Sequence, residues 1–466
     1  MEIDGDELKP LNESLLMASL PILTVLEQSQ VSPPPATVGH RSLPLTFFDL
    51  AWLSEPPVHH LFFYELPITK PQFIETIVPT LKNSLSITLQ HFFPFVGNLI
   101  VFPTRNPEIR HVDGDSIAVT FAESDLDFAY LTGNHPRDCG KFYPLIPLLG
   151  HATKASADYV TIPVFSVQVT VFPGCGISIG MTNHHCLGDA STRVCFLKAW
   201  TSIARSGTDE SFLANGPLPL YDRVIKYPKL DEIYLKNAKI ETFTQEYQLP
   251  SLSEPTNNVR ATFVLTRTII NRLKKRVSTQ LPTLEYISSF TVACAYIWSS
   301  AAKVRNDGVH VFGFVIDCRS RMVPVIPPTY FGNCVAPCGA MASTIVLTEK
   351  DGFVTAAKLL GENLHKKLTD NDGILKDAES WFDFSFGEVP ITMMGVAGTP
   401  KIRFYDTDFG WGKPKKYEIV SIDYNGSISM NACKESNEDL EIGVCLSATE
   451  MKAFVCVFNS GLEEYI

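Results

Sequence analysis

The sequence predicts a mixed α/β protein built from two large domains. Its 466 residues are enough for two or three domains at roughly 150 residues each. Hydrophobic residues make up 45% and charged residues 19%, a balance that supplies a large buried core and excludes a disordered chain. Strand-like and helix-like patterns are mixed along the whole length, with no internal repeat and no βαβ fingerprint.

The first half predicts an N-terminal domain over residues 17–205. Residues 1–16 are polar and acidic, so we expect a mobile N-terminal extension. Beyond them, short apolar runs predict strands, and apolar residues at helical spacing predict helices. In chain order we expect strands in 42–53 and 59–66, a helix in 74–95, a hairpin in 109–123, paired strands at 164–172 and 177–183, and a helix in 191–205.

The second half predicts a C-terminal domain over residues 259–466, reached through a polar crossover at 206–258 that is rich in Pro, Ser, Glu and Asn. Some exchange of strands between the two domains is expected. The patterns predict strands at 259–266, 310–317, 417–424, 427–433 and 441–447, and helices at 269–280, 288–303, 351–368 and 448–462.

Charge and cysteine content restrict the function classes. The chain has 39 Lys+Arg against 50 Asp+Glu, a net charge of −11, which argues against a general binder of nucleic acid or anionic membranes. A small polyanion needs only a local cluster of cations and is not excluded. The 11 cysteines include no CxxC pair, which favours reduced thiols over a disulfide framework or a metal site. We expect a soluble, cytoplasmic monomer, since no signal peptide or long apolar span is evident.

Two histidines begin an HxxxD spacing, His111 with Asp115 and His185 with Asp189. The spacing alone is weak, because chance can produce it in a chain with 11 histidines. His111 lies in a predicted turn and is interpreted as a surface hairpin residue. His185 follows a strongly apolar strand and leads into a helix, a junction that can hold a side chain rigidly in a cleft.

Two further motifs distinguish the second histidine. They are Asp408-Phe-Gly-Trp-Gly412 and Tyr330-Phe-Gly-Asn-Cys334. Together with the HHCLGDA segment at 184–190, the DFGWG motif resembles the BAHD acyltransferases of plant secondary metabolism. The YFGNC motif is similar to the branch that acylates anthocyanins and other flavonoid glucosides. The resemblance extends from Met17 to Ile466.

The resemblance implies a fold and an activity. The fold would be two chloramphenicol-acetyltransferase-like domains of mixed sheets and helices, with the active-site channel between them. The activity would be transfer of a malonyl group from malonyl-CoA to a sugar hydroxyl, the glucose 6″-OH, of an anthocyanidin 3-O-glucoside or related flavonoid glucoside. Malonyl-CoA would be a co-substrate, and no permanently bound cofactor or metal is expected.

Acyl transfer to a sugar hydroxyl suits the chemistry of His185. A neutral imidazole with a pKa near 6.5 can remove the hydroxyl proton at cytosolic pH and return it to the CoA thiolate. A thioester is already activated, so neither a metal nor a covalent acyl-enzyme is required. Cys186 is a weak alternative nucleophile, because nothing in the sequence indicates a lowered pKa.

Other motif residues are expected to support the site rather than react. In the family the motif aspartate pairs with an arginine, which implies an Asp189–Arg319 pair that holds the shape of the site. The resemblance also gives DFGWG an architectural role, since its glycines suit a tight turn and Trp411 offers a large packing surface. Asp408, Gly410, Trp411 and Gly412 are therefore predicted to be structural.

The donor must be held by cations. Arg193 stands four residues after Asp189, where the resemblance implies a guanidinium that binds the malonyl carboxylate. A solvated helix arginine is the alternative. Tentative contacts for the CoA phosphates are two basic runs, although such runs more often form a solvated surface: Lys274, Lys275 and Arg276, and Lys413, Lys415 and Lys416.

Three alternatives remain open from the sequence. The first keeps the fold but uses a hydroxycinnamoyl-CoA or acetyl-CoA donor, or an amine acceptor. The second is a non-catalytic protein that binds CoA or a flavonoid. The third is a thioesterase-like hydrolase that uses the same His–Asp pair.

Overall fold

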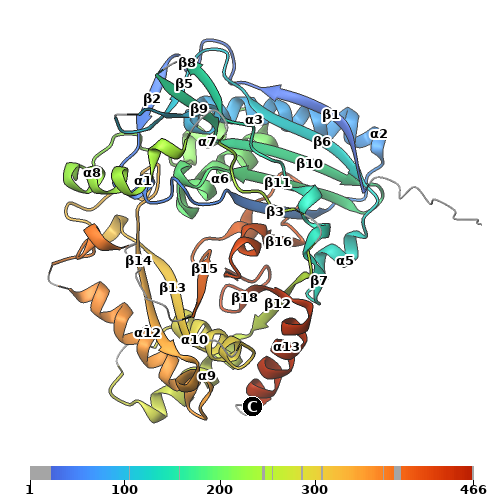
Figure 1. Ribbon diagram of the computed structural model, residues 1–466. Coiled ribbons are helices and arrows are strands. Elements are labelled where there is room, and N and C mark those ends of the chain that lie inside the picture. The colour runs from blue at the N-terminus through green and yellow to red at the C-terminus, as the bar shows by residue number, and fades with distance from the viewer. Residues whose placement is uncertain are drawn as a thin grey trace, which may run out of the picture.

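The computed structural model describes residues 22–103, 105–156, 158–243, 247–253, 256–284, 287–305, 308–370, 372–381 and 390–463. The expected extension at 1–16 lies outside these residues. In Figure 1 most of the first half, blue to green, forms the upper lobe, and most of the second half, yellow to red, forms the lower lobe. Both lobes contain strands and helices, which confirms the predicted α/β class.

Three sheets organise the described residues. The six-stranded sheet has the order β1 (Leu23–Val31), β6 (Ile117–Ser124), β10 (Phe165–Phe172), β11 (Gly176–Asn183), β3 (Val58–Glu65) and β16 (Lys416–Ile419). The seven-stranded sheet has the order β14 (Val335–Ser343), β13 (Val309–Asp317), β15 (Ile391–Ala397), β17 (Ile428–Ala432), β18 (Leu440–Ser447), β12 (Asn258–Leu265) and β7 (Arg137–Asp138). The five-stranded sheet has the order β2 (Arg41–Pro44), β5 (Glu108–His111), β4 (Asn98–Val101), β9 (Tyr159–Pro163) and β8 (Thr153–Ser156).

The helices that matter for the site are α1 (Phe47–Leu50), α3 (Val78–His91) and α6 (Ala190–Ser206). The remaining helices are α2 (Lys70–Gln72), α4 (Phe93–Val96), α5 (Phe128–Thr132), α7 (Glu210–Asn215), α8 (Pro228–Asn237), α9 (Arg267–Gln280), α10 (Ser289–Ala302), α11 (Thr344–Thr348), α12 (Gly352–Thr369) and α13 (Ala448–Glu463). Helices α7 and α8 lie within the polar crossover at 206–258.

Strands β10 and β11 form the centre of the upper lobe. Every residue of both strands is buried, including the polar residues Ser166, Gln168 and Thr170 that alternate with apolar residues in β10. Val167 and Val169 belong to a core cluster that also contains α3 and α6, whereas Phe172 packs with Phe63 and Phe128 in a second cluster. Helix α6 is thus fixed to a rigid sheet, and the segment between β11 and α6 is fixed at both ends.

Each large sheet receives an edge strand from the other half of the chain. Strand β16, at 416–419, pairs antiparallel with β3 in the upper lobe. Strand β7, at 137–138, pairs antiparallel with β12 in the lower lobe. The polypeptide therefore crosses the boundary between the lobes more than once, and residues from both halves meet there.

Several local expectations were wrong. The hairpin expected at 109–123 does not form, because β5 pairs with β2 and β4 whereas β6 pairs with β1 and β10. His111, expected at the surface of that hairpin, is buried. The strand expected at 417–424 ends at Ile419 and is followed by a 3₁₀ turn. Residues 47–50 form helix α1 rather than strand, because Thr46 and Asp49 make a capping box that satisfies the first backbone N–H groups of a helix. The expected helix at 74–95 is divided into a π-helical turn at Phe73–Ile77, helix α3 and helix α4. Pro79 and Pro94 stand in the first turns of α3 and α4, where a missing N–H is tolerated.

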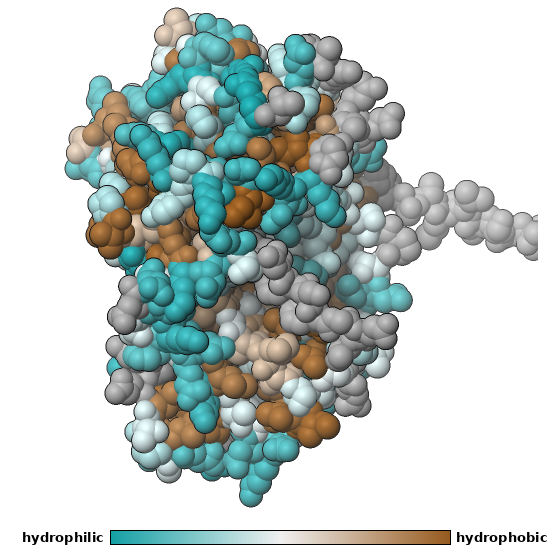
Figure 2. Space-filling model, turned by 60° about the vertical axis from the view of Figure 1, so that its left-hand side comes forward, coloured by the Kyte–Doolittle hydropathy of each residue, from teal (hydrophilic) through white to brown (hydrophobic). Residues whose placement is uncertain are grey.

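The surface of the molecule mixes polar and apolar residues. Figure 2 shows hydrophilic and hydrophobic side chains interspersed over one face, as is usual for the outside of a folded domain. Among the described residues, no helix has the length and apolar composition needed to cross a membrane.

Candidate active site

The segment that carries His185 connects β11 to α6 through one short turn. His184 begins the turn, and its Nδ1 accepts a hydrogen bond from the Cys186 N–H at 3.3 Å. Asp189 caps α6 by accepting hydrogen bonds from the N–H groups of Ser191 (3.0 Å) and Thr192 (3.2 Å). Gly188 is required between them, because a Cβ there would lie 2.7–2.9 Å from the side chain of Thr192.

The His185 imidazole is held in an apolar setting. Trp52 stacks on it, with ring centroids 4.3 Å apart and an interplanar angle of 10°. Burial, and next the positive charge of Arg193, lower the pKa of His185 to about 3. The ring is therefore neutral at physiological pH, as a general base must be. Burial raises the pKa of the Cys186 thiol well above its usual range, so the neighbouring cysteine does not supply a thiolate.

Asp189 is occupied by partners other than the histidine. Its carboxylate accepts from Arg319 Nη1 at 2.7 Å, from Arg319 Nη2 at 3.2 Å and from the Cys334 N–H at 3.1 Å, in addition to the two N–H groups of α6. Both residues are buried. These contacts join the start of α6 to the second half of the chain and give Asp189 a positioning role.

The YFGNC segment is the other half of this junction. Arg319 also donates to the carbonyls of Tyr330 (3.1 Å) and Gly332 (3.0 Å), and Thr192 Oγ1 bonds both the carbonyl and the N–H of Gly332. The Asn333 amide nitrogen donates to the carbonyl of His185 at 3.2 Å. The motif thus clamps the backbone of the catalytic turn.

Sequence reasoning missed Asp49 and Arg223, which complete the clamp. Asp49 Oδ1 accepts from the Asn333 N–H (2.8 Å) and side chain (3.2 Å), and Oδ2 lies 3.3 Å from Arg223 Nη2. Arg223 donates to the carbonyl of Phe331 at 2.7 Å. The Thr46–Asp49 spacing is a readable capping-box signal for α1, but no local signal points to a partner 284 residues away. Trp52, which follows α1 and its C-cap Ala51, was missed for the same reason.

The DFGWG segment closes on itself. Asp408 Oδ1 accepts from the N–H groups of Gly410 (2.7 Å) and Gly412 (2.9 Å), and both glycines have positive φ, 100° and 86°. Trp411 stacks on Phe409, which in turn packs edge-on against Trp200 of α6. Arg205 donates to the Asp408 carbonyl. Trp200 and Arg205 lie toward the C-terminal end of α6, far from Asp189, so these contacts support an architectural role for the predicted residues.

Arg193 projects from the first turn of α6 into the same region as His185. Its Nη1 donates to the Gly188 carbonyl at 2.7 Å, whereas its Nε is buried without a hydrogen-bond partner in the described part of the chain. Arg193 acts electrostatically on His185, His60 and Tyr417. A guanidinium near a neutral histidine can bind an anionic group of a substrate.

The two basic runs differ in their surroundings. Lys416 is 3% exposed and its ammonium is bound to Glu441 (2.6 Å) and Asn134 (2.9 Å), which favours a structural role. Three other residues of these runs form ion pairs with carboxylates: Lys413 with Asp406, Lys415 with Glu65, and Arg276 with Asp351. Contact of Lys274, Lys275, Arg276, Lys413 or Lys415 with CoA phosphates stays a prediction.

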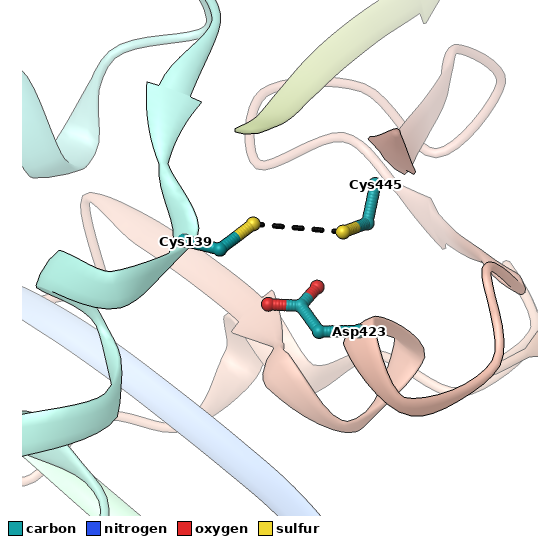
Figure 3. Close-up of side chains that lie close together, drawn as sticks. All are labelled: Cys139, Asp423 and Cys445. Carbon is teal, nitrogen blue, oxygen red and sulfur yellow. Dashed lines mark hydrogen bonds between the residues drawn. The ribbon is translucent and has the colours of Figure 1, made fainter. Parts of the chain in front are cut away.

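Among the described residues, one group of side chains has the spacing of metal ligands: Cys139, Asp423 and Cys445, which point toward one another (Figure 3). The two sulfurs are 3.5 Å apart, and Arg260 Nη1 lies 3.6 Å from Asp423. A hydrogen bond with Cys139, together with burial, raises the pKa of the Cys445 thiol, whereas metal binding needs a thiolate. The guanidinium also supplies the positive charge that Asp423 requires, so we interpret the group as a structural cluster.

Comparisons with known proteins identify a family match, relatives in sequence and a similar fold. The profile of the Transferase family matches residues 22–460. The chain is 56% identical to malonyl-coenzyme A:anthocyanin 3-O-glucoside-6″-O-malonyltransferase of Dahlia pinnata, over 97% of this chain and 100% of the relative. It is 42% identical to phenolic glucoside malonyltransferase 1 of Nicotiana tabacum, over 94% and 99%. The crystal structure of vinorine synthase is similar in fold, with a TM-score of 0.66 and 20% identity over 92% of this chain and 96% of that one.

Proposed function

The chain belongs to the Transferase (BAHD) family of acyl-CoA-dependent acyltransferases, and from that premise we propose that it transfers a malonyl group from malonyl-CoA to the glucose 6″-OH of an anthocyanidin 3-O-glucoside or related flavonoid glucoside. The observation that carries the proposal is the position of Arg193 beside the neutral His185. It offers a positive charge to the carboxylate that distinguishes a malonyl from an acetyl or coumaroyl group. Free cysteines, among them buried Cys139, Cys294 and Cys318, support a cytoplasmic location.

The reaction follows from the chemistry of His185. The imidazole removes the proton of the sugar hydroxyl while the hydroxyl oxygen attacks the thioester carbonyl. The C–O bond forms, the tetrahedral intermediate collapses, and the C–S bond breaks. The imidazolium then returns its proton to the departing CoA thiolate. Trp52 stabilises the transient imidazolium through its π face, a cation–π interaction of about 1 kcal/mol or more. Both substrates must be present together, because no acyl-enzyme is formed.

The malonyl carboxylate would also assist the base. Arg193 lowers the pKa of His185 through its positive charge. A carboxylate bound to Arg193 neutralises that charge, and the pKa of His185 then moves back toward its ordinary value. Because the strength of a general base follows its pKa, the anionic donor improves the base that uses it.

A direct assay tests the proposal. The protein is incubated with malonyl-CoA and an anthocyanidin 3-O-glucoside, and the acceptor is analysed by mass spectrometry. We expect the mass gain of one malonyl group, with slower turnover of acetyl-CoA and p-coumaroyl-CoA. His185→Ala should abolish product, whereas His111→Asn, at the other HxxxD site, should retain it. Release of CoA without acylated acceptor would instead indicate a hydrolase, and a preference for coumaroyl-CoA would contradict the malonyl assignment.

A further inference from the structure

Several buried polar atoms near the turn that carries His185 have no hydrogen-bond partner in the described residues, and three of them are His60 Nε2, Arg193 Nε and His185 Nδ1. Leaving one such atom unsatisfied costs about 1–3 kcal/mol, so orphaned atoms in one region indicate that something polar occupies the space between them. The three side chains share one region, since Arg193 and His185 both act electrostatically on His60. His185 has its task in catalysis and Arg193 was expected at the donor. His60 has no assigned role.

His60 reaches this region from the sheet. In the antiparallel pairing of β3 with β11 and β16, His60 stands opposite Met181 and Ile419, while Tyr417 stands opposite Phe62. Directly paired residues, and residues two positions apart on one strand, point to the same face of a sheet. His60, Phe62, Met181 and Tyr417 therefore share one face. It is the face on the side of α6, since Tyr64, two positions after Phe62, contacts Phe409, which packs on Trp200 of α6, whereas Leu61 and Phe63, which point to the opposite face, belong to the second cluster. His60 and Arg193 therefore approach the same space from a strand and from a helix.

A hydrogen bond to Tyr417 sets the proton on the His60 ring. The Tyr417 hydroxyl lies 2.5 Å from His60 Nδ1. Burial raises the pKa of Tyr417 well above its usual range, and burial together with the charge of Arg193 lowers the pKa of His60 well below its own. Both groups are therefore neutral. A phenol O–H donates to an imidazole nitrogen, so Nδ1 accepts and the ring proton resides on Nε2, the orphaned atom.

We propose that His60 is a substrate-binding residue, whose Nε2–H donates a hydrogen bond to the carboxylate of the acyl donor that Arg193 binds through charge. Tyr417 is the positioning residue that fixes the donating tautomer. The inference rests on the proposed malonyl donor and adds a second, neutral contact from a different element. Two donors on rigid elements fix the direction of the carboxylate, which aims the thioester carbonyl at the acceptor hydroxyl. Because His60 is neutral, the positive charge of Arg193 and the negative charge of the donor carboxylate cancel when the donor is bound.

His59 is a matched control from the neighbouring position. It points to the opposite face, and both of its nitrogens have partners, Nδ1 with Thr182 Oγ1 and Nε2 with the Tyr424 hydroxyl, each at 2.9 Å. It is as deeply buried as His60. A substitution at His59 therefore disturbs the same strand without touching the donor carboxylate.

The test compares the affinity of two donors that differ by the carboxylate. Dissociation constants of malonyl-CoA and acetyl-CoA are measured by calorimetry without acceptor, for the intact protein and for His60→Phe, His60→Gln, Tyr417→Phe and His59→Phe. Removal of a hydrogen bond to a charged group should weaken malonyl-CoA about tenfold to hundredfold in His60→Phe and leave acetyl-CoA within about twofold. His60→Gln, which keeps an N–H donor, should recover part of the loss, and Tyr417→Phe should show a smaller loss in the same direction. His59→Phe should keep the preference of the intact protein.

The outcomes separate this inference from the proposed function. An intact protein that binds both donors equally would overturn the malonyl assignment itself. An intact protein that prefers malonyl-CoA, with the same preference in His60→Phe and Tyr417→Phe, would overturn only the role of His60. Thermal unfolding identifies any variant that does not fold. If His60→Phe does not fold, Tyr417→Phe, which removes a single oxygen, still tests the role of His60.

Discussion

Asp189 accepts hydrogen bonds from three parts of the chain: the first turn of α6, the guanidinium of Arg319 and the backbone of Cys334. Its two oxygens are therefore fully used in holding the start of α6 against the YFGNC segment. His185, four residues earlier, is held instead by Trp52 stacking and by the Asn333 bond to its carbonyl. These contacts support separate tasks for the two residues of the HxxxD spacing, the proposed proton transfer for His185 and a structural role for Asp189.

Asp189→Asn should damage the fold of the site rather than the proton transfer. The amide loses the negative charge that pairs with Arg319 and turns an N–H₂ group toward other donors. Breaking a buried pair by removing one partner costs on the order of 3–5 kcal/mol, so the melting temperature should fall clearly. The pH at which kcat/KM is half-maximal should change little, since His185 still carries the proton.

A control for this substitution lies on the same arginine. Asp317 Oδ1 is 3.2 Å from Arg319 Nη1, but its side chain is 52% exposed. Asp317→Asn should leave the melting temperature nearly unchanged, because a solvated carboxylate contributes little. A normal melting temperature in Asp189→Asn, combined with a shifted pH–rate profile, would contradict the structural role of Asp189.

Single residues can be identified from the sequence when they belong to a short local motif. His185, Asp189 and Arg193 follow one another within nine positions at a strand–helix junction, and the resemblance supplied Arg319 as a partner. Asp49 and His60 belong to the same site, yet their partners are Asn333 and Tyr417, 284 and 357 positions away. No spacing rule reaches such distances, because these contacts exist only after the lobes have come together.

Helix α6 is the element that joins the motifs. Its first turn carries the Asp189 cap and Arg193, and its last turns carry the contacts of Trp200 and Arg205 with the DFGWG loop. With 17 residues it is about 25 Å long. We therefore expect the DFGWG loop to influence the reaction through α6, whose other end adjoins the turn that carries His185.

The two ends of α6 offer a paired test of the clamp that the YFGNC segment forms on the turn with His185. A Cβ at Gly188 would lie 2.7–2.9 Å from Thr192, whose hydroxyl is tied to Gly332 and cannot retreat. Gly188→Ala should displace the catalytic turn, and kcat should fall at least about tenfold, since misplacement by 1 Å can cost a factor of about 100. Gly207, at the other end, has φ +76° and open space around it. Gly207→Ala should cost about 1–2 kcal/mol in stability and leave kcat unchanged. Equal kcat values for the two variants would contradict the clamp.

Helices and strands could be predicted from the sequence where the apolar pattern extends over many residues. The helix expected at 191–205 is α6 at 190–206, and the buried strands expected at 164–172 and 177–183 are β10 and β11. Helix α1 was mistaken for strand because four residues are too few to show a helical period. Its Thr46–Asp49 capping box outweighed the strand-like apolar run.

The order of strands across the whole molecule lies beyond any reading of local pattern. The sequence indicates a strand at 417–424, but not that residues 416–419 form the edge of a sheet whose other strands all come from the first half of the chain. That position follows from side-chain burial across the lobe boundary. Glu418 of β16 meets Arg137 Nη1 at 2.7 Å and Arg260 Nη2 at 3.3 Å, and all three residues are buried. This ionic cluster connects the edge of the upper sheet to β7 and β12 of the lower sheet.

The stability of the whole molecule should therefore depend on the ionisation of Glu418. Burial alone would raise the pKa of this carboxyl, but the charges of Arg137, Arg260 and Lys416 lower it from 4.5 to about 2. A carboxyl with a lowered pKa stabilises the fold above its unfolded pKa, and that stability is lost as the pH falls from about 4.5 through about 2. The contribution is on the order of 3 kcal/mol.

Glu418→Gln should lose this contribution at pH 7, and the difference in unfolding midpoint between the variant and the intact protein should shrink as the pH approaches 2. Unfolding midpoints measured from pH 7 downward test this, with Glu232→Gln as a control, because the exposed Glu232–Lys236 pair should show no such difference. A constant gap between Glu418→Gln and the intact protein across this range would mean that the cluster holds the lobes by shape rather than by charge.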